Sequence, residues 1–395
     1  MFPRPGHFQL VNTPAGFEEA AGLLAQGSGP IAVDTERASG YRYDDRAFLV
    51  QVHRRGAGVF LFDPEGQRQD FRSILGPVLS GQCWVVHAAA SDLPCLASLG
   101  LRPGTLVDTE LGGRLLGMPK VNLAAMHEEL LGIHLAKGHG AEDWSRRPLP
   151  PSWLDYAADD VAYLLDVAEV LVEKLDLDGK LDIFAQECAH ILAQHAHPLQ
   201  PPTFGQLKGV HRVRDPRQLG TARALFDARD NLARKNDLSP QRILKSKDLI
   251  EIALSERQRR HVFPRYVKPR YRAALQKALR EPVVPGQETS LPPKNSDCPS
   301  KSSWPAVDPH SWDVLTAVRD QLSDLADSVR IPVENLIQPA ILREAVWECA
   351  GPAGAWPVTV NRIRVILERA GARAWQIDAV AGIIFACLRE AETAL

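Results

Sequence analysis

Two carboxylates lie two residues apart where an apolar run ends, in Ile31-Ala-Val-Asp-Thr-Glu36. On a β-strand, residues i and i+2 point to the same face of the sheet, so Asp34 and Glu36 are expected to project together. Neighbouring carboxylates repel each other unless a cation lies between them. Mg²⁺ is typically held by one or two protein carboxylates and by phosphate oxygens of a substrate. The pair indicates a metal site for phosphoryl chemistry, and a solvated strand end is the alternative for this pattern alone.

A later predicted helix, from Pro151 to Leu175, carries a phenol beside a carboxylate. Tyr156 and Asp160 are four residues apart, so they share one face of that helix. Asp155 and Asp159 form a second pair at the same spacing, rotated by about 100° around the helix axis. The spacing by itself leaves both pairs open as partners for the earlier carboxylates.

A sheet with helices on both faces would position these groups. Strands are predicted at Ile31–Glu36, Ala47–His53 and Gly58–Phe62, which form an antiparallel unit, and at Cys83–His87 and Leu106–Asp108. Helices are predicted at 17–26, up to 79, around 91–96, up to 117 and at 122–131. Strands that alternate with helices indicate a mixed α/β sheet. Asp92 follows the fourth strand and begins a helix, so capping that helix is its alternative role.

The length of 395 residues exceeds the usual limit for a single hydrophobic core, which predicts two or three domains. Apolar residues make up 45% of the chain and charged residues 24%, as in globular proteins. No apolar run has the length of a membrane span and no leader begins the sequence, so we expect a cytoplasmic protein without a membrane partner. The six cysteines include no C-x-x-C pair, which argues against a zinc ribbon, a redox motif and a disulfide framework.

Charge is distributed unevenly along the chain. The segment from Leu207 to Arg280 contains 20 Lys or Arg against 7 Asp or Glu, although the whole chain has a net charge of −2. Helical periodicity from Leu219 to Arg234, and again near 238–253 and 271–279, predicts an all-α module. An excess of 13 positive charges favours binding of a polyanion, whereas any single arginine is equally well explained by a solvated helix face.

Composition also predicts the domain boundaries. A proline-rich stretch at 197–202 indicates a linker, and a stretch rich in Pro, Ser and charged residues at 281–303 indicates a second, flexible one. Helical periodicity returns from Ser311 to Leu395. We therefore predict an α/β domain at 1–195, a linker at 196–206, a helical domain at 207–280, a flexible linker at 281–304 and a C-terminal helical domain at 305–395.

Taken in order, these segments resemble the ribonuclease D family of DEDDy-type 3′→5′ exonucleases, which carry three motifs. The matching stretches are Asp34-Thr-Glu36 with Phe48-Leu-Val-Gln51, His87-Ala-Ala-Ala-Ser-Asp92, and Tyr156-Ala-Ala-Asp-Asp160. The third match favours Tyr156 and Asp160 over the neighbouring pair. The basic segment, with Pro240-x-x-Ile243-Leu244, resembles an HRDC domain, and the last domain, with Trp375-Gln376, resembles the second HRDC-like domain of the family. The resemblance implies a ribonuclease H-like mixed sheet followed by two all-α HRDC-type domains.

The resemblance also implies a metal-dependent 3′→5′ exoribonuclease that releases nucleoside 5′-monophosphates. Two divalent ions, Mg²⁺ or Mn²⁺, would be held by the four motif carboxylates, Asp34, Glu36, Asp92 and Asp160. Tyr156 would orient the attacking water. The expected substrate is RNA with a free 3′ end, such as a tRNA precursor, and the expected protein is a monomer. A DNA exonuclease in repair and a non-catalytic RNA-binding protein are the alternatives, since nothing in the motifs reads the 2′-hydroxyl.

Seven further residues are candidates for contact with the substrate: Gln51, His87, Lys137, Arg147, Arg257, Arg259 and Arg260. Gln51 either packs within the sheet or approaches the terminal nucleotide. His87 is alternatively a hydrogen-bonded core histidine, because Mg²⁺ prefers oxygen ligands. Lys137 and Arg147 lie in the loop before the third motif, for which a solvated loop is the alternative. Aromatic residues among the last arginines either stack on unpaired bases or fill a small helical core.

Overall fold

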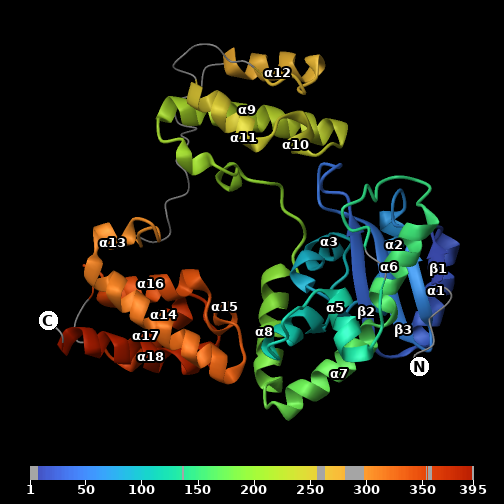
Figure 1. Cartoon of the computed structure of the whole chain (residues 1–395). Helices are drawn as coiled ribbons and strands as arrows, with labels where there is room; N and C mark the ends of the chain where they lie inside the picture. The colour runs from blue at the N-terminus through green and yellow to red at the C-terminus, as the bar shows by residue number, and fades with distance from the viewer. Residues whose placement is uncertain are drawn as a thin grey trace.

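The computed structural model describes residues 8–135, 138–255, 263–280, 298–352, 354 and 358–393. It contains an α/β unit followed by two helical units, as Figure 1 shows. This architecture confirms the predicted fold class. The predicted flexible linker at 281–304 lies largely outside the described residues. Within the described part of the chain, no helix combines the length and apolarity that a membrane crossing requires.

Six strands form one mixed sheet in the order β1-β4-β3-β2-β5-β6. They span Phe8–Val11 (β1), Ser28–Arg37 (β2), Ala47–Arg55 (β3), Gly58–Phe62 (β4), Cys83–Val86 (β5) and Thr105–Asp108 (β6). β2, β3 and β4 pair antiparallel, as predicted, whereas β1 runs parallel to β4, β5 to β2, and β6 to β5. β1 was not predicted, because a four-residue edge strand is too short to show clear alternation.

Helices cover both faces of this sheet. They are α1 Pro14–Gln26, α2 Arg68–Leu79, η1 Ala89–Ser91 (a 3₁₀ helix), α3 Leu93–Ser98, α4 Thr109–Leu115, α5 Leu123–Leu131, α6 Pro151–Ala162, α7 Leu164–Leu177 and α8 Leu181–His195. On one face, Phe17 of α1 and Phe71 of α2 join a buried core with Val33 of β2. On the other face, Trp153 of α6 packs in a separate core with Ala32.

The alternation of β2 decides where its acidic residues point. Because successive strand residues face opposite sides, Asp34 and Glu36 lie on the same face of the sheet as Ala32, which is the face that α6 covers. Gln51 of β3 is the cross-strand partner of Asp34, so its side chain lies on this same face. Thr35, between the two carboxylates, points to the opposite face.

The prediction of a single helix from Pro151 to Leu175 is wrong, because α6 and α7 are separated at Tyr163. This residue has φ −112° and ψ 4°, outside the helical region. Its ring is buried and lies edge-on to the ring of His127, with the centroids 6.0 Å apart. α6 packs against the sheet, whereas Val167 and Leu171 of α7 pack around Met126. The bend lets one apolar stretch of sequence serve two separate surfaces.

The first helical unit contains η2 Phe204–Gln206, η3 Val210–Arg212, α9 Pro216–Asn236, α10 Pro240–Ile243, α11 Ser246–Leu254 and α12 Pro269–Arg280. α9 begins after Asp215, whose side chain accepts hydrogen bonds from two backbone N–H groups. It ends at Asp237, which has a left-handed backbone with φ +46°. Phe263 and Tyr271 are buried in the core of this unit, whereas Tyr266 is 40% exposed. The first two aromatic side chains therefore fill a helical core.

The second helical unit contains α13 Trp304–Val307, α14 Pro309–Val329, α15 Val333–Leu336, α16 Pro339–Ala350, α17 Val360–Arg369 and α18 Ala374–Thr393. α16 ends before Gly351. This unit is joined to the α/β unit by a buried ion pair, in which Arg373 Nε lies 2.5 Å from Glu187 Oε1. Ile331 completes the contact, since it belongs to the core that underlies the sheet.

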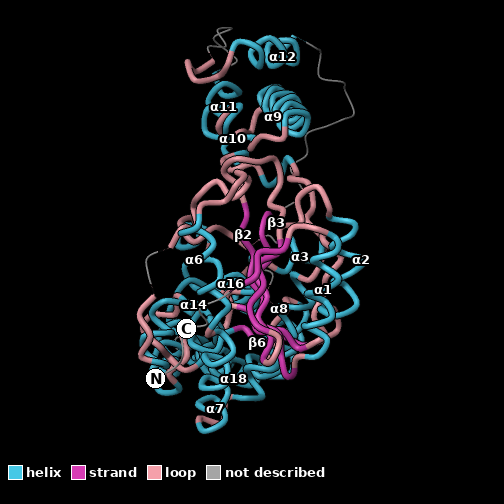
Figure 2. The backbone as a smooth tube through the Cα atoms, turned by 90° about the vertical axis from the view of Figure 1, so that its right-hand side faces the viewer, coloured by secondary structure: helices cyan, strands magenta, loops and turns pink. Residues whose placement is uncertain are grey.

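The first helical unit docks on the loop between β2 and β3, residues 38–46. The Asp237 carboxylate accepts a hydrogen bond of 2.8 Å from Arg46, and the Tyr43 hydroxyl donates one of 2.8 Å to Asp230. The backbone N–H of Ser239 donates to the carbonyl of Tyr41. In Figure 2, α9, α10 and α11 lie beyond the ends of β2 and β3. The basic unit is therefore fixed next to the end of the strand that carries the acidic pair.

Candidate active site

Three carboxylates converge at the end of β2. Asp34 and Glu36 project from β2 and Asp160 from α6, and each offers an oxygen within 4.8 Å of the others. Among the described residues this group includes Asp160 but neither Asp155 nor Asp159. The fold thus brings the first and third motifs together.

Burial and repulsion favour protonated carboxyl groups in this cluster. Burial, followed by the charges of Asp160 and Asp92, raises the pKa of Glu36 from 4.5 to about 9. Burial also raises the pKa of Asp160 to about 7, and burial together with three acidic neighbours raises that of Asp34 well above 3.8. Desolvation and like charges both penalise the ionised form, and a cation among the carboxylates would relieve the repulsion. The cluster fits a divalent metal ion, since oxygen ligands are those that hard cations prefer.

Asp92 is held apart from the other three by its own hydrogen bonds. Its side chain makes no capping hydrogen bond to α3, which excludes the alternative role considered above. Instead it accepts hydrogen bonds from Thr35 Oγ1 at 2.5 Å and from Ser91 Oγ at 2.6 Å. Arg37 Nε lies 3.9 Å from Asp92 Oδ1. Burial raises the pKa of Asp92, and Arg37 opposes this shift. Asp92 is therefore fixed beside the cluster, with its charge partly balanced.

The backbone before Asp92 is fixed by a buried carboxylate that the sequence analysis did not single out. Asp108, at the end of β6, accepts hydrogen bonds from the backbone N–H groups of Ala88 and Ala89 at 3.1 and 2.9 Å. It also caps α4 through the N–H of Leu111. Ala88 has a left-handed backbone with φ +56°. Asp108 therefore stabilises the turn that presents Asp92. In the sequence, its place at the end of the short strand predicted at Leu106–Asp108 is a signal for this role.

Tyr156 stands next to Asp160 at the edge of the cluster. Its hydroxyl is hydrogen-bonded to Asp160, and burial together with the neighbouring carboxylates raises the pKa of the phenol. The loop before α6 packs against its ring. A Cβ atom at Gly138 would lie 2.7 Å from Tyr156 Cε2, and the His139 ring lies edge-on with its centroid 5.8 Å away. The phenol is thus a neutral hydrogen-bonding group held at the carboxylates.

Comparison with known proteins agrees with this geometry. A family model described as 3′-5′ exonuclease matches residues 8–176, one described as HRDC domain matches 218–262, and one described as 3′ to 5′ exonuclease C-terminal domain matches 297–388. Ribonuclease D of Gluconacetobacter diazotrophicus is 34% identical over 171 residues, which is 43% of each chain. The crystal structure of a protein from Bifidobacterium adolescentis is 31% identical, with a TM-score of 0.81 and coverage of 98% of both chains.

The chain carries 3′-5′ exonuclease and HRDC domains and is similar to the ribonuclease D of several bacteria. It shares the fold of Escherichia coli RNase D, which is 22% identical, with a TM-score of 0.68 and coverage of 97% of this chain and 99% of that one. Its matches span 43 to 66% of the length of the first three curated ribonuclease D relatives.

Two of the expected substrate contacts, Gln51 and His87, lie in the described part of the exonuclease domain. Gln51 is fully buried, and neither its amide oxygen nor its amide nitrogen has a hydrogen-bond partner among the described residues. His87 Nδ1 lies 2.9 Å from Thr109 Oγ1, and burial lowers the pKa of its ring to about 4. These positions favour a packing role for His87. Contact between Gln51 and the terminal nucleotide stays a prediction.

Arg147 is occupied by contacts within the protein. Its guanidinium donates to the Asp63 carboxylate at 2.5 and 2.8 Å and to the backbone carbonyls of Phe48, Trp144 and Arg146. Since a guanidinium has five N–H donors, these bonds leave none for a phosphate, and they argue against the expected contact. Four other candidates lie outside the described residues: Lys137, Arg257, Arg259 and Arg260.

Proposed function

We propose that the protein is a metal-dependent 3′→5′ exoribonuclease of the ribonuclease D type, which releases nucleoside 5′-monophosphates from RNA. The observation that carries the proposal is the convergence of Asp34, Glu36 and Asp160 within 4.8 Å, with Tyr156 hydrogen-bonded at the edge of the group. Carboxylates gathered in this way, from a strand and a helix far apart in sequence, hold a positive charge where a phosphodiester can be bound.

The four carboxylates would divide the work of holding cations. Burial and the charges of Asp92, Asp160 and Glu36 raise the pKa of Asp34, so all three carboxylates act on it. As the resemblance to the family implies, Asp34 would help to hold both ions, and Glu36 and Asp160 would hold the ion that activates the attacking water. Asp92 would act at the second position through a water molecule, which agrees with its hydrogen bonds to Thr35 and Ser91.

Two divalent ions, Mg²⁺ or Mn²⁺, would when bound lower the pKa of the attacking water and neutralise charge on the departing 3′ oxygen. The chain's own contribution is orientation. The Tyr156 hydroxyl, kept protonated by its raised pKa, can donate a hydrogen bond to Asp160 or contact the water through its oxygen. Arg37 balances the charge of Asp92 without entering the group of three.

RNA with a free 3′ end, such as a tRNA precursor, is the proposed substrate. The solved Escherichia coli RNase D is described as an exoribonuclease involved in structured RNA processing. The basic helical unit supports a polyanionic substrate, because phosphate neutralisation depends mainly on the number of cations. DNA is the alternative substrate. The predicted domain boundaries, the cytoplasmic location and the monomeric state stay predictions.

A cleavage assay tests the proposal. RNA and DNA oligonucleotides of matched sequence, labelled at the 5′ end, would be incubated with Mg²⁺, with Mn²⁺ or with EDTA. We expect stepwise shortening of RNA that requires the metal. Asp34→Asn should abolish this cleavage, and the exposed control variant Asp155→Asn should retain it. Equal cleavage of DNA would favour the repair exonuclease. Tight RNA binding without cleavage under either metal would refute the enzyme.

A further inference from the structure

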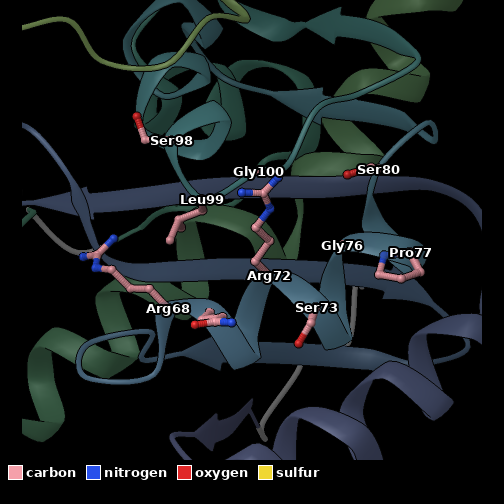
Figure 3. A pocket seen from close by; sticks show the side chains of 10 residues that line it. Arg68, Arg72, Ser73, Gly76, Pro77, Ser80, Ser98, Leu99 and Gly100 are labelled. Atoms are coloured by element: carbon pink, nitrogen blue, oxygen red, sulfur yellow. The ribbon is translucent and has the colours of Figure 1, made fainter.

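A basic hollow lies on the face of the sheet opposite to the carboxylate cluster. It has a volume of about 850 Å³ between α2 and the end of α3, and Figure 3 shows the residues that line it. The lining contains two arginines, glutamine and three serines but no acidic residue: Arg68, Gln69, Arg72, Ser73, Gly76, Pro77, Ser80, Ser98, Leu99 and Gly100. A lining with two cations and several hydroxyl groups has the chemistry of an anion site.

Arg72 is the cation that this hollow leaves available. Among the described residues no ion pair or hydrogen bond occupies its guanidinium. Its side chain lies across Gly100, where a Cβ atom would come within 2.4 Å of Arg72 Nε. Gly100 has φ +81°, a conformation that glycine adopts without strain. In Figure 3 the side chain reaches from α2 towards Leu99 and Gly100. The backbone at Gly100 thus holds the guanidinium in the hollow.

Arg68, one helical turn earlier, is partly engaged. It is paired with Glu65, and its Nη2 donates to the carbonyl of Ala47 at 2.6 Å. Its Nη1 has no partner among the hydrogen bonds of the described residues. Arg68 therefore adds one donor and part of a positive charge beside Arg72.

Contacts link the lining of the hollow to the docking region of the basic helical unit. Glu65, the partner of Arg68, also lies 3.5 Å from Arg46 Nε, and Arg46 binds Asp237. On the other side, Ser98 Oγ accepts a hydrogen bond from the backbone N–H of Leu199, in the segment that leads to that unit. Figure 2 shows α2 and α3 on one side of the sheet, below α9 to α11. An anionic chain bound by the helical unit can extend over α2.

We infer that this hollow binds backbone phosphates of the RNA body, several nucleotides upstream of the 3′ end that enters the carboxylate cluster. The inference rests on the proposed function for its ligand. It concerns a face of the sheet that the cluster does not use, so it assigns Arg72 to RNA binding and not to cleavage. A short single strand that fills the catalytic face does not reach the hollow, whereas a folded RNA does.

Binding in a non-cleaving background tests this inference separately from the enzyme proposal. In Asp34→Asn protein, fluorescence anisotropy would measure the affinity for a stem-containing RNA and for a single strand of about six nucleotides, since single-strand sites span roughly 4–16 nucleotides. Arg72→Glu should weaken the affinity for stem-containing RNA by about 5- to 10-fold and leave the affinity for the short strand unchanged. The milder Arg72→Gln should reduce the salt slope by about 1. Arg319→Glu, an exposed arginine of α14, is the matched control.

The outcomes separate the possible ligands. Equal weakening of both RNAs, or of neither, would overturn the inference. The inference would also be overturned if inorganic phosphate raises the melting temperature of the wild type but not of Arg72→Glu, while both RNA affinities stay unchanged. The hollow would then bind free phosphate and not RNA. If the wild-type protein cleaves no RNA, the enzyme proposal fails. The difference in RNA affinity between Arg72→Glu and Arg319→Glu still tests whether the hollow binds RNA.

Discussion

Glu36→Gln should stabilise the metal-free protein, and increasingly so as the pH rises. Burial and acidic neighbours raise the pKa of Glu36 from 4.5 to about 9 in the folded protein. Between these two values the folded carboxyl group keeps its proton and the unfolded one loses it. Folding then binds a proton, so the stability of the wild type falls with rising pH. The penalty is absent below about pH 4.5 and complete above about pH 9. Glutamine resembles the protonated acid and removes it.

The magnitude follows from the slope of this linkage. One group that is protonated only in the folded state costs about 1.4 kcal/mol per pH unit. From pH 6 to pH 8 the free-energy advantage of Glu36→Gln should therefore grow by about 3 kcal/mol. For a unit of this size, this corresponds to roughly 6 to 12 °C in the melting temperature.

Thermal melts in EDTA at several pH values between 6 and 9 would measure this difference. The chain has several cores, so the relevant transition is the one that Mn²⁺ shifts. Asp155→Asn on the same helix as Asp160 is exposed and should show no such trend. Bound metal should stabilise the wild type more at pH 8 than at pH 6, because carboxyl groups must release protons to bind it. A difference between Glu36→Gln and wild type that stays constant across this range would refute the reasoning.

Three further predictions concern the tyrosine, the docking loop and a close backbone contact. Tyr156→Phe should lower kcat by about 10- to 100-fold at unchanged melting temperature, because it removes one hydroxyl that positions a reactant; unchanged kcat in single-turnover assays would contradict this. Asp237→Asn keeps a residue that tolerates φ +46° but weakens the bond to Arg46, and limited proteolysis should then cut faster near 38–46. Gly104→Ala should destabilise the protein by at least about 2 kcal/mol, because its Cβ would lie 2.4 Å from a backbone oxygen. The Cβ of Gly22→Ala would meet nothing within 4 Å, so this variant should stabilise the protein by about 0.5–1 kcal/mol. Urea titrations would measure both differences.

Much of the candidate site could be predicted from the sequence because the deciding patterns are local. The spacing of Asp34 and Glu36 on a strand fixes that they share a face, and the four-residue spacing of Tyr156 and Asp160 does the same on a helix. The three antiparallel strands and the basic helical unit also follow from periodicity and composition. Each of these properties depends on residues within a few positions of one another.

Tertiary structure decided what depends on distant segments. Thr35 and Arg37 hold Asp92 across more than fifty residues of sequence, and no spacing rule connects them. The bend at Tyr163 was missed because the apolar period continues through it, and only the two surfaces it serves require a break.

Contacts between distant segments also explain why the guanidinium groups of Arg147 and Arg72 differ in their hydrogen bonding. In the sequence Arg147 is a candidate for substrate contact because it lies in the loop before the third motif, whereas nothing singles out Arg72. Packing places Arg147 against Asp63 and three carbonyl groups, where all its donors are used. It places Arg72 across Gly100, where no described residue accepts a hydrogen bond from its guanidinium. The sequence by itself determined the kinds of side chain and their local faces, and the fold determined which charges are satisfied, because charge compensation depends on contacts between residues far apart along the chain.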